Sequence, residues 1–314
     1  MKKLRFIPLF ALTALLSGCS LFGGGAGKAP KFEKEGEEVK YAKFTEALED
    51  AYKDSELYDT DSKLGDRIVK TNISTTQTRS VKRGKKEVSK TTETQTFKGE
   101  SQFDYSNLTA KETGERKYTA KSSDQEGSSN ETSNAKLEYH YQFEKVDGVK
   151  SFVMANAKTK EYRVYSSLSS GTDEEDLFDS VVRSSFSYVS YIFQGYMPSS
   201  SADAEDYLFY NNNDTIFTYV KNDEDSSKSD NYNVETTIKI KAQVNLTDKK
   251  QAARLSYETT TVYTYKKDYN GYLEDDVVTE ETKAYAEMTG TAKDVNVKAV
   301  DIDDYSLIKN SYGY

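Results

Sequence analysis

The dominant pattern after residue 66 is an alternation of apolar and polar residues, and a period of two predicts β-strands. It is clearest at 234–246, where valine, isoleucine, alanine, threonine and leucine occupy every second position. That register turns Ile238 and Ile240 towards the interior and the intervening lysines towards water. Short turns separate the predicted strands, whereas parallel pairs need long crossover connections, so we expect an antiparallel sheet.

A second strict alternation covers residues 137–143. Tyr139, Tyr141 and Phe143 share one side of this stretch, while glutamate, histidine and glutamine share the other. A hairpin is expected next, because the Asp-Gly pair at 147–148 tolerates the positive φ angles of a type I′ turn. The three aromatic side chains are therefore expected to line the inner surface of the sheet.

Glycines and polar clusters predict where the remaining strands turn. Lys98-Gly99 and Thr113-Gly114 are expected to be turns, because glycine adopts backbone conformations that other residues avoid. The ranges 123–134 and 222–231 are polar throughout and are expected to be surface loops.

Two segments have the period of an amphipathic helix. Alanine, leucine and aromatic residues recur at helical spacing between Val39 and Tyr58. A wider apolar band runs from Thr172 to Met197 and follows a capping box with Thr172 as the expected N-cap. The β-branched and aromatic stretch 186–193 leaves a strand as the alternative there, although length and capping favour a helix.

The apolar band of this second helix is wider than contact with one sheet surface requires, which suggests that it covers a cavity. The candidate ligand-binding residues are the apolar side chains expected on the two facing surfaces of helix and sheet. They are Phe178, Val182, Phe186, Val189, Tyr139, Tyr141, Phe143, Ile238 and Ile240.

The first nineteen residues have the pattern of an export signal, with a basic start, an apolar run and small residues before a cleavage position. The run Phe6–Leu16 is shorter than the roughly 20 residues that span a bilayer core. Leu16-Ser17-Gly18-Cys19 resembles the lipobox of bacterial lipoproteins. The resemblance implies cleavage before Cys19 and lipidation of that cysteine. We therefore expect a signal peptide at 1–18, a flexible tether at 19–38 and a single antiparallel β-rich domain at 39–314.

The element order helix, strands, helix, strands, combined with an export signal, resembles the LolA/LppX-like carriers of bacterial envelopes over residues 39–300. The resemblance implies a cavity for acyl chains between a curved sheet and its helices. We expect an α+β fold: a curved antiparallel sheet, an unclosed half-barrel of about ten or more strands, with two helices packed on its concave side.

Charge, composition and the absence of known motifs limit the functions that the sequence supports. The chain has 43 basic and 52 acidic residues, and the predicted signal peptide carries three of the basic ones and no acid, which leaves a net charge of −12. This balance disfavours nucleic-acid binding, which needs a basic surface, and leaves lipid on Cys19 as the expected membrane contact. His140 is the only histidine and is expected to be a solvated strand residue. No zinc site, cofactor loop or catalytic motif is recognisable, so we predict no catalytic residue, metal or cofactor.

Three hypotheses for function remain. The first is a non-enzymatic carrier or sensor of an apolar ligand, such as a lipid acyl chain, held in a cavity between sheet and helix. The alternative is a tethered surface module with a structural or interaction role and no small-molecule ligand, and an envelope hydrolase is the least favoured. We expect the protein to be exported and lipid-anchored at the outer face of the bacterial cytoplasmic membrane, with the outer membrane left open. A cavity would favour the carrier, and a filled seam the module.

Overall fold

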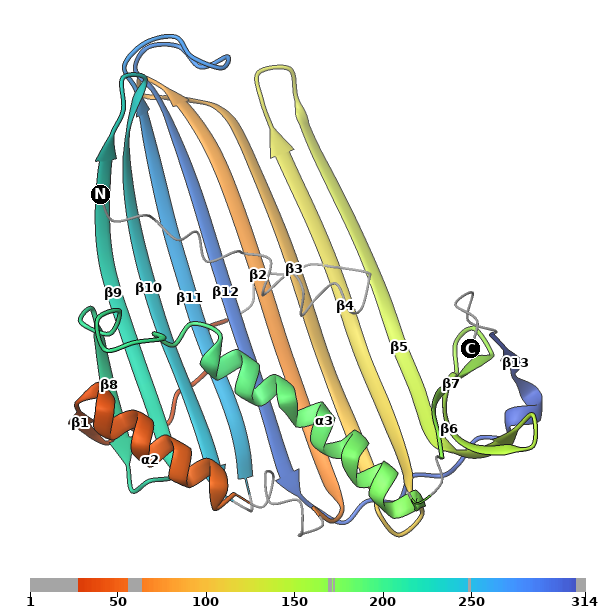
Figure 1. The fold of residues 1–314 in the computed structure, drawn as a ribbon. Coiled ribbons are helices and arrows are strands. Elements are labelled where there is room, and N and C mark those ends of the chain that lie inside the picture. The colour runs from red at the N-terminus through yellow and green to blue at the C-terminus, as the bar shows by residue number, and fades with distance from the viewer. Residues whose placement is uncertain (1–27, 56–63, 169–170, 172, 248–249, 309–314) are drawn as a thin grey trace.

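The computed structural model describes the chain except for residues 1–27, 56–63, 169–170, 172, 248–249 and 309–314. Its described residues form one 13-stranded sheet with two α-helices on one face (Figure 1). Strand pairs are antiparallel except that of β7 and β13. The terminal strands of the sheet, β1 and β13, each have one neighbour among the described strands, so the sheet is unclosed. The expected fold class is confirmed. Both the signal peptide and Cys19 lie outside the described residues.

The strand order is β1-β8-β9-β10-β11-β12-β2-β3-β4-β5-β6-β7-β13. Two meanders, β2–β7 and β8–β12, are thus joined side by side through the β12–β2 pair, and α3 connects them along the chain. The helices are α2 (Tyr41–Lys53) and α3 (Glu174–Gln194), and a 3-10 turn covers Ile302–Asp304. The strands are β1 (Glu37–Val39), β2 (Arg67–Arg83), β3 (Lys86–Asp104), β4 (Thr109–Ser123), β5 (Ser128–Val146), β6 (Val149–Asn156), β7 (Glu161–Ser167), β8 (Tyr207–Asn212), β9 (Ile216–Lys228), β10 (Tyr232–Thr247), β11 (Lys250–Tyr265), β12 (Asp276–Ala292) and β13 (Ser306–Leu307).

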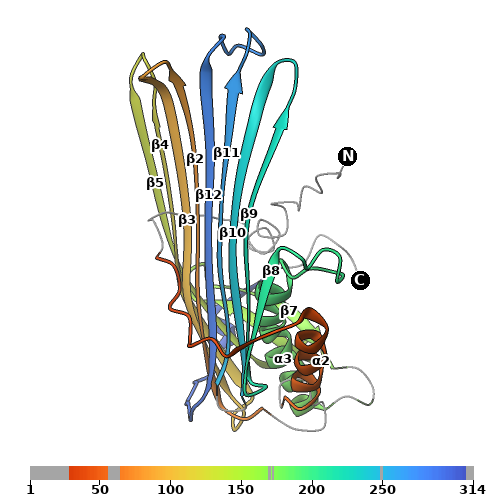
Figure 2. The same cartoon turned by 90° about the vertical axis from the view of Figure 1, so that its left-hand side faces the viewer.

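The helices cover only one end of the long strands. Figure 2 shows α2 and α3 against the lower part of one face, while the upper part of the sheet is a single layer. A strand of 17 residues such as β2 extends about 55 Å, so much of its length lies beyond the helices. We call the two parts the helix-covered half and the single-layer half, with the boundary near Ile240 on β10 and Tyr257 on β11.

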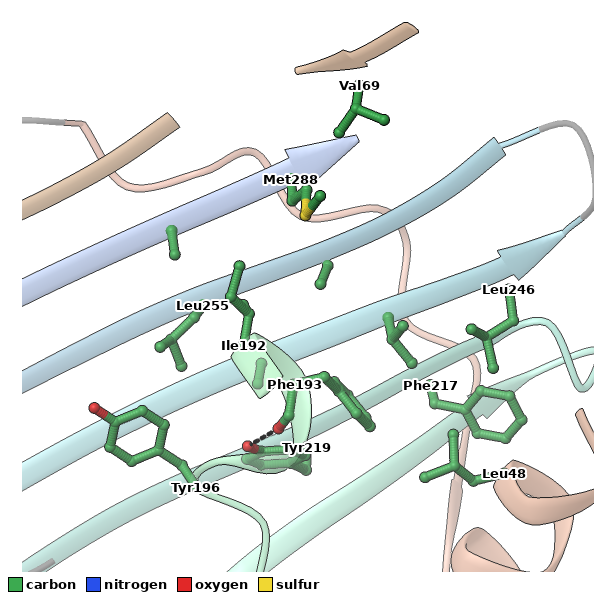
Figure 3. Close-up of a cluster of buried hydrophobic side chains, with 14 of the residues drawn as sticks. Leu48, Val69, Ile192, Phe193, Tyr196, Phe217, Tyr219, Leu246, Leu255 and Met288 are labelled. Carbon is green, nitrogen blue, oxygen red and sulfur yellow. Dashed lines mark hydrogen bonds between the residues drawn. The ribbon is translucent and has the colours of Figure 1, made fainter. Parts of the chain in front are cut away.

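The hydrophobic core lies in the helix-covered half, between the helices and the sheet (Figure 3). Phe44 and Leu48 of α2 are buried there, as the predicted apolar stripe requires. Ile192 and Phe193 of α3 point to the sheet, and Tyr219 of β9 donates its hydroxyl to the Phe193 carbonyl. The helix therefore packs on the sheet through both apolar and polar contacts.

The beginning of α3 differs by one residue from the prediction. Asp173 is the N-cap, because its carboxylate accepts a 2.8 Å hydrogen bond from the Asp176 backbone N–H. Thr172, the expected cap, lies outside the described residues. The helical interpretation of 186–193 is confirmed, since α3 continues to Gln194.

The prediction of a flexible tether up to residue 38 is wrong at its C-terminal end. The Glu33 backbone N–H donates to Gln243 Oε1 at 2.8 Å, and its carboxylate contacts Arg254 at 3.1 Å. Residues 37–39 then form β1, which pairs with β8. This segment covers the face of β10 and β11 that is opposite the helices, which explains why Gln243 and Arg254 are buried.

Two predicted turns lie inside strands. Gly99 of β3 is directly opposite Gly114 of β4, so neither marks a change of direction. A Cβ atom added to Gly99 would lie 2.6 Å from Cζ of Phe97, because that ring lies over both glycines. The chain turns instead after Asp104, whose carboxylate accepts from the Asn107 backbone N–H at 3.0 Å.

The two predicted polar loops are also largely strand. β4 ends at Ser123 and β5 begins at Ser128, so only residues 124–127 form a turn. β9 likewise continues to Lys228. Both stretches belong to the single-layer half, where water reaches both faces and polar side chains are tolerated on each.

Candidate functional site

The seam between α3 and the sheet brings most of the predicted ligand-binding residues together. Phe178 and Val182 of α3 are 0 % exposed, and Ile240 of β10 is 3 % exposed. Tyr141, Phe143 and Ile238 are half-buried and pack against the same cluster. The inward register predicted for β5 and β10 is therefore correct.

Phe152 of β6 contacts predicted residues of both the sheet and α3. Its ring centroid lies 4.9 Å from that of Phe143, 5.9 Å from that of Phe178 and 6.2 Å from that of Tyr141. Phe152 is fully buried, although it was not among the predicted ligand-binding residues. Its position directly after the Asp-Gly hairpin, opposite Phe143, was the available signal.

The other predicted residues are less central. Tyr139 is half-buried on the helix-bearing face of β5 but lies outside the core cluster. Phe186 and Val189 belong to α3, but their side chains are not among those that the structure describes.

The seam is filled around Phe178 and Val182. A side chain that lines an empty cavity wide enough for an acyl chain exposes surface to that cavity, yet Phe178 and Val182 expose none. Polar contacts close the end of the seam near the start of α3, where the Tyr105 hydroxyl donates to Asp179 Oδ1 at 2.8 Å. Burial, followed by the nearby Glu112 carboxylate, raises the pKa of Tyr141 well above its usual value, so its hydroxyl stays protonated and donates to Glu112 at 3.1 Å.

A second aromatic cluster lies at the far end of the single-layer half. It consists of Tyr232, Tyr263, Tyr265, Tyr269 and Tyr272, and we call it the distal tyrosine cluster. The ring centroids of Tyr265 and Tyr272 lie 4.6 Å apart, and those of Tyr232 and Tyr265 lie 5.6 Å apart. The tyrosines of this cluster come from both sides of the connection between β11 and β12, and the sequence alone did not predict that they converge.

Arginine and carboxylate side chains surround the distal tyrosine cluster. The Arg79 guanidinium lies 5.6 Å from the centre of the Tyr272 ring and donates to Glu280 at 3.0 Å. Arg83 donates two hydrogen bonds to Asp276 at 2.9 and 3.0 Å, and this pairing lowers the pKa of the Asp276 carboxyl. Tyr269 is 39 % exposed and Leu273 is 42 % exposed, so the cluster presents aromatic and apolar surface to solvent.

His140 is not solvated as predicted but 8 % exposed. Residues after β12 cross this face of the sheet beside it, and the Val300 backbone N–H donates to Gln142 Oε1 at 2.7 Å. Among the described residues, no three His, Cys, Asp or Glu side chains lie close enough to hold a metal ion. Within the same residues, neither helix is both long and apolar enough to cross a bilayer.

Two surface grooves have volumes of about 820 and 760 Å³. The first lies on the face opposite the helices and is lined by alternating lysines and glutamates, including Lys70, Glu100 and Lys136. The second lies between α2 and the β8–β9 turn and includes Glu46 and Asp50. Both are charged, and neither includes a predicted ligand-binding residue.

Comparisons with known proteins leave the family open. No family profile matches the chain, and no curated protein matches it. One solved structure with a weak similarity is the outer membrane protein OprG from Pseudomonas aeruginosa, at 8 % sequence identity and a TM-score of 0.20. The match covers 74 % of this chain and 98 % of OprG. A similarity this low carries no conclusion about either fold or function.

Proposed function

We propose that this protein is a non-enzymatic lipoprotein of the bacterial cell envelope, anchored through Cys19, that serves as a tethered interaction module. The anchor rests on the lipobox-like sequence at 16–19. The α3–sheet seam acts as the structural core, and the single-layer half is the part offered to a partner. A tethered module of this kind is the alternative to the lipid carrier that the sequence leaves open.

The observation that carries the proposal is the complete burial of Phe178 and Val182. A lipid carrier would keep these positions accessible to a ligand, because they lie on the face of α3 that would cover the cavity. Their filled surroundings favour a role in stability instead.

The distal tyrosine cluster supports the interaction role. Tyrosine and arginine are enriched among the residues that dominate protein interfaces, since they combine a large contact area with hydrogen-bonding groups. Here both types occur together, far from the core and inside a charged rim.

Binding of a fluorescent fatty acid to wild type and to Val182→Trp, with the melting temperature of each, tests the proposal. We expect no binding by wild type and a loss of about 1–3 kcal/mol or more in the variant, because tryptophan overpacks a filled core. Saturable binding by wild type, abolished in a variant of unchanged stability, would establish the carrier instead.

The anchor has a separate test in cell fractionation. We expect Cys19→Ala to leave the membrane fraction, because two lipid chains on this cysteine would supply the stable attachment. A variant that stays in the membrane pellet at high salt, with its signal uncleaved, would identify Phe6–Leu16 as the anchor.

A further inference from the structure

The upper part of β5 has a strand on one side only. Residues 128–138 pair with β4, whereas β6 pairs with β5 only from Tyr139 onwards. Figure 1 shows this part of β5 at the outer margin of the single-layer half. Among the described strands none lies beyond it, so one edge of β5 is open from residue 128 to residue 137, or over roughly 30 Å.

The register identifies the backbone groups that point outward. The two-residue turn after Val146 makes Val146 and Val149 a hydrogen-bonded pair. The backbone N–H and C=O groups of the even-numbered residues of β5 therefore point towards β6. The Glu138 carbonyl follows this rule, since it accepts from the Ala157 backbone N–H on that side. Continued along the strand, the rule places the N–H and C=O groups of Asn130, Thr132, Asn134 and Lys136 on the open edge.

The other open edge of the single-layer half is protected by charge. Residues 222–228 of β9 extend beyond β8 and include Asp223, Glu224 and Asp225. If two copies paired through this edge with the two-fold axis at any of these three residues, acidic side chains of the two copies would lie opposite each other. Native proteins commonly use charged side chains in this way to block pairing of sheet edges.

The β5 edge lacks such protection, and we propose that it pairs with the β5 edge of a second copy around a two-fold axis. Its residues from 128 to 136 are serine, threonine, asparagine and alanine apart from Glu131 and Lys136. If the two-fold axis passes through Ser133 or Asn134, each residue of one β5 lies opposite a residue of the other β5. In neither register do two like charges then lie opposite each other. Opposed threonine, serine and asparagine side chains hydrogen-bond across such pairs. This inference goes beyond the proposed function and concerns a surface separate from the distal tyrosine cluster.

Light scattering of the full chain in nonionic detergent, with the detergent mass subtracted, tests the proposal across a hundredfold dilution. Thr132→Pro removes an outward N–H while leaving the bonds to β4, because proline is tolerated where the N–H of an edge strand faces solvent. Ser226→Pro is the matched control, since residue 226 points outward on the β9 edge. We expect a dimer for wild type and for Ser226→Pro, and a monomer for Thr132→Pro with an unchanged circular dichroism spectrum.

A second variant keeps the test decisive if Thr132→Pro fails to fold. The pair Thr132→Lys with Asn134→Lys places lysine opposite lysine in both centred registers and should also give a monomer. A monomeric wild type would overturn the proposal, leaving the β5 edge free for a strand of another protein. Dissociation by Ser226→Pro would overturn the two-fold arrangement, because it would mean that β5 pairs with β9.

Discussion

The two halves of the sheet share their strands but differ in what stabilises them. On β10, Ile240, Ala242 and Val244 belong to the core between the sheet and the helices and are at most 3 % exposed. On the same face of the same strand, Val234 and Thr236 are only half-buried, because no helix covers them. Burial of apolar surface therefore stabilises one half, while the other depends on contacts between neighbouring strands.

Those contacts are visible as cross-strand pairs. The Oγ1 atoms of Thr76 and Thr94 lie 3.3 Å apart, and the tyrosine rings at the tip form a small core of their own. Pairs of this kind contribute roughly 0.2–1 kcal/mol each, much less than a fully buried aromatic side chain. The difference implies that the helix-covered half carries most of the stability.

The largest expected effect belongs to Phe178 in the seam. Phe178→Ala should cost about 3–5 kcal/mol, because it leaves a cavity among Tyr105, Phe152 and Val182. Urea unfolding followed by circular dichroism measures the loss. A cost below about 1 kcal/mol would mean that the seam is loosely packed, and this result would favour the carrier hypothesis.

One strand allows a comparison of both halves. Ile240→Ala should cost about 2–5 kcal/mol, whereas Val234→Ala should cost roughly 1 kcal/mol or less. The exposed Lys239 is the control, and Lys239→Ala should change stability by less than about 0.5 kcal/mol. Lys241 is unsuitable because it is paired with Glu35. Equal costs at Ile240 and Val234 would contradict the division into halves.

The ion pair at the tip gives the single-layer half a pH dependence. Arg83 lowers the pKa of Asp276, so this pair stabilises the fold above the carboxyl's usual pKa of about 3.9 and is lost as pH falls through the lowered value. Asp276→Asn should cost about 1–3 kcal/mol at pH 7 and weaken the loss of stability below pH 4. Unfolding curves at pH 7 and pH 3 measure both. An unchanged pH dependence would assign it to other carboxylates.

The smallest effect is expected at the exposed edge of the distal tyrosine cluster. Tyr269→Ala should change stability by less than about 0.5 kcal/mol, because this residue is 39 % exposed and lies at the edge of the cluster. Thermal unfolding measures it, with the buried Tyr265→Ala as the destabilised comparison. A large loss for Tyr269→Ala would assign that residue to the structure of the tip rather than to a contact surface.

The sequence predicted the fold best where one face of a strand is buried. The period at 234–246 and the Asp-Gly hairpin at 147–148 gave the correct register, since burial imposes alternation on the sequence. Residues 128–134 and 222–228 were mistaken for loops because neither of their faces is covered. A strand in a single layer needs no apolar face, and its polar sequence is then indistinguishable from that of a loop.

The sequence also failed to predict which polar strand residues are buried by distant segments of the chain. Gln243 and His140 lie opposite the apolar positions of their strands, where the period predicts solvent, yet both are buried. Distant segments of the chain contact Gln243 itself and Gln142 beside His140. The site residues Phe178, Val182, Tyr141 and Ile240 were correctly brought to one seam. Whether that seam is empty or filled depends on the volumes of partners such as Phe152, which the periodicity of a single strand does not contain.

Amide hydrogen exchange along β11 tests the division into halves most directly, because this strand crosses the boundary. We predict that amides at 251–257 exchange only through global unfolding. Those at 258–265 should open locally and exchange at least about tenfold faster, which corresponds to roughly 1.4 kcal/mol. Equal protection along the whole strand would contradict the account, because it would show that the single layer is as stable as the helix-covered core.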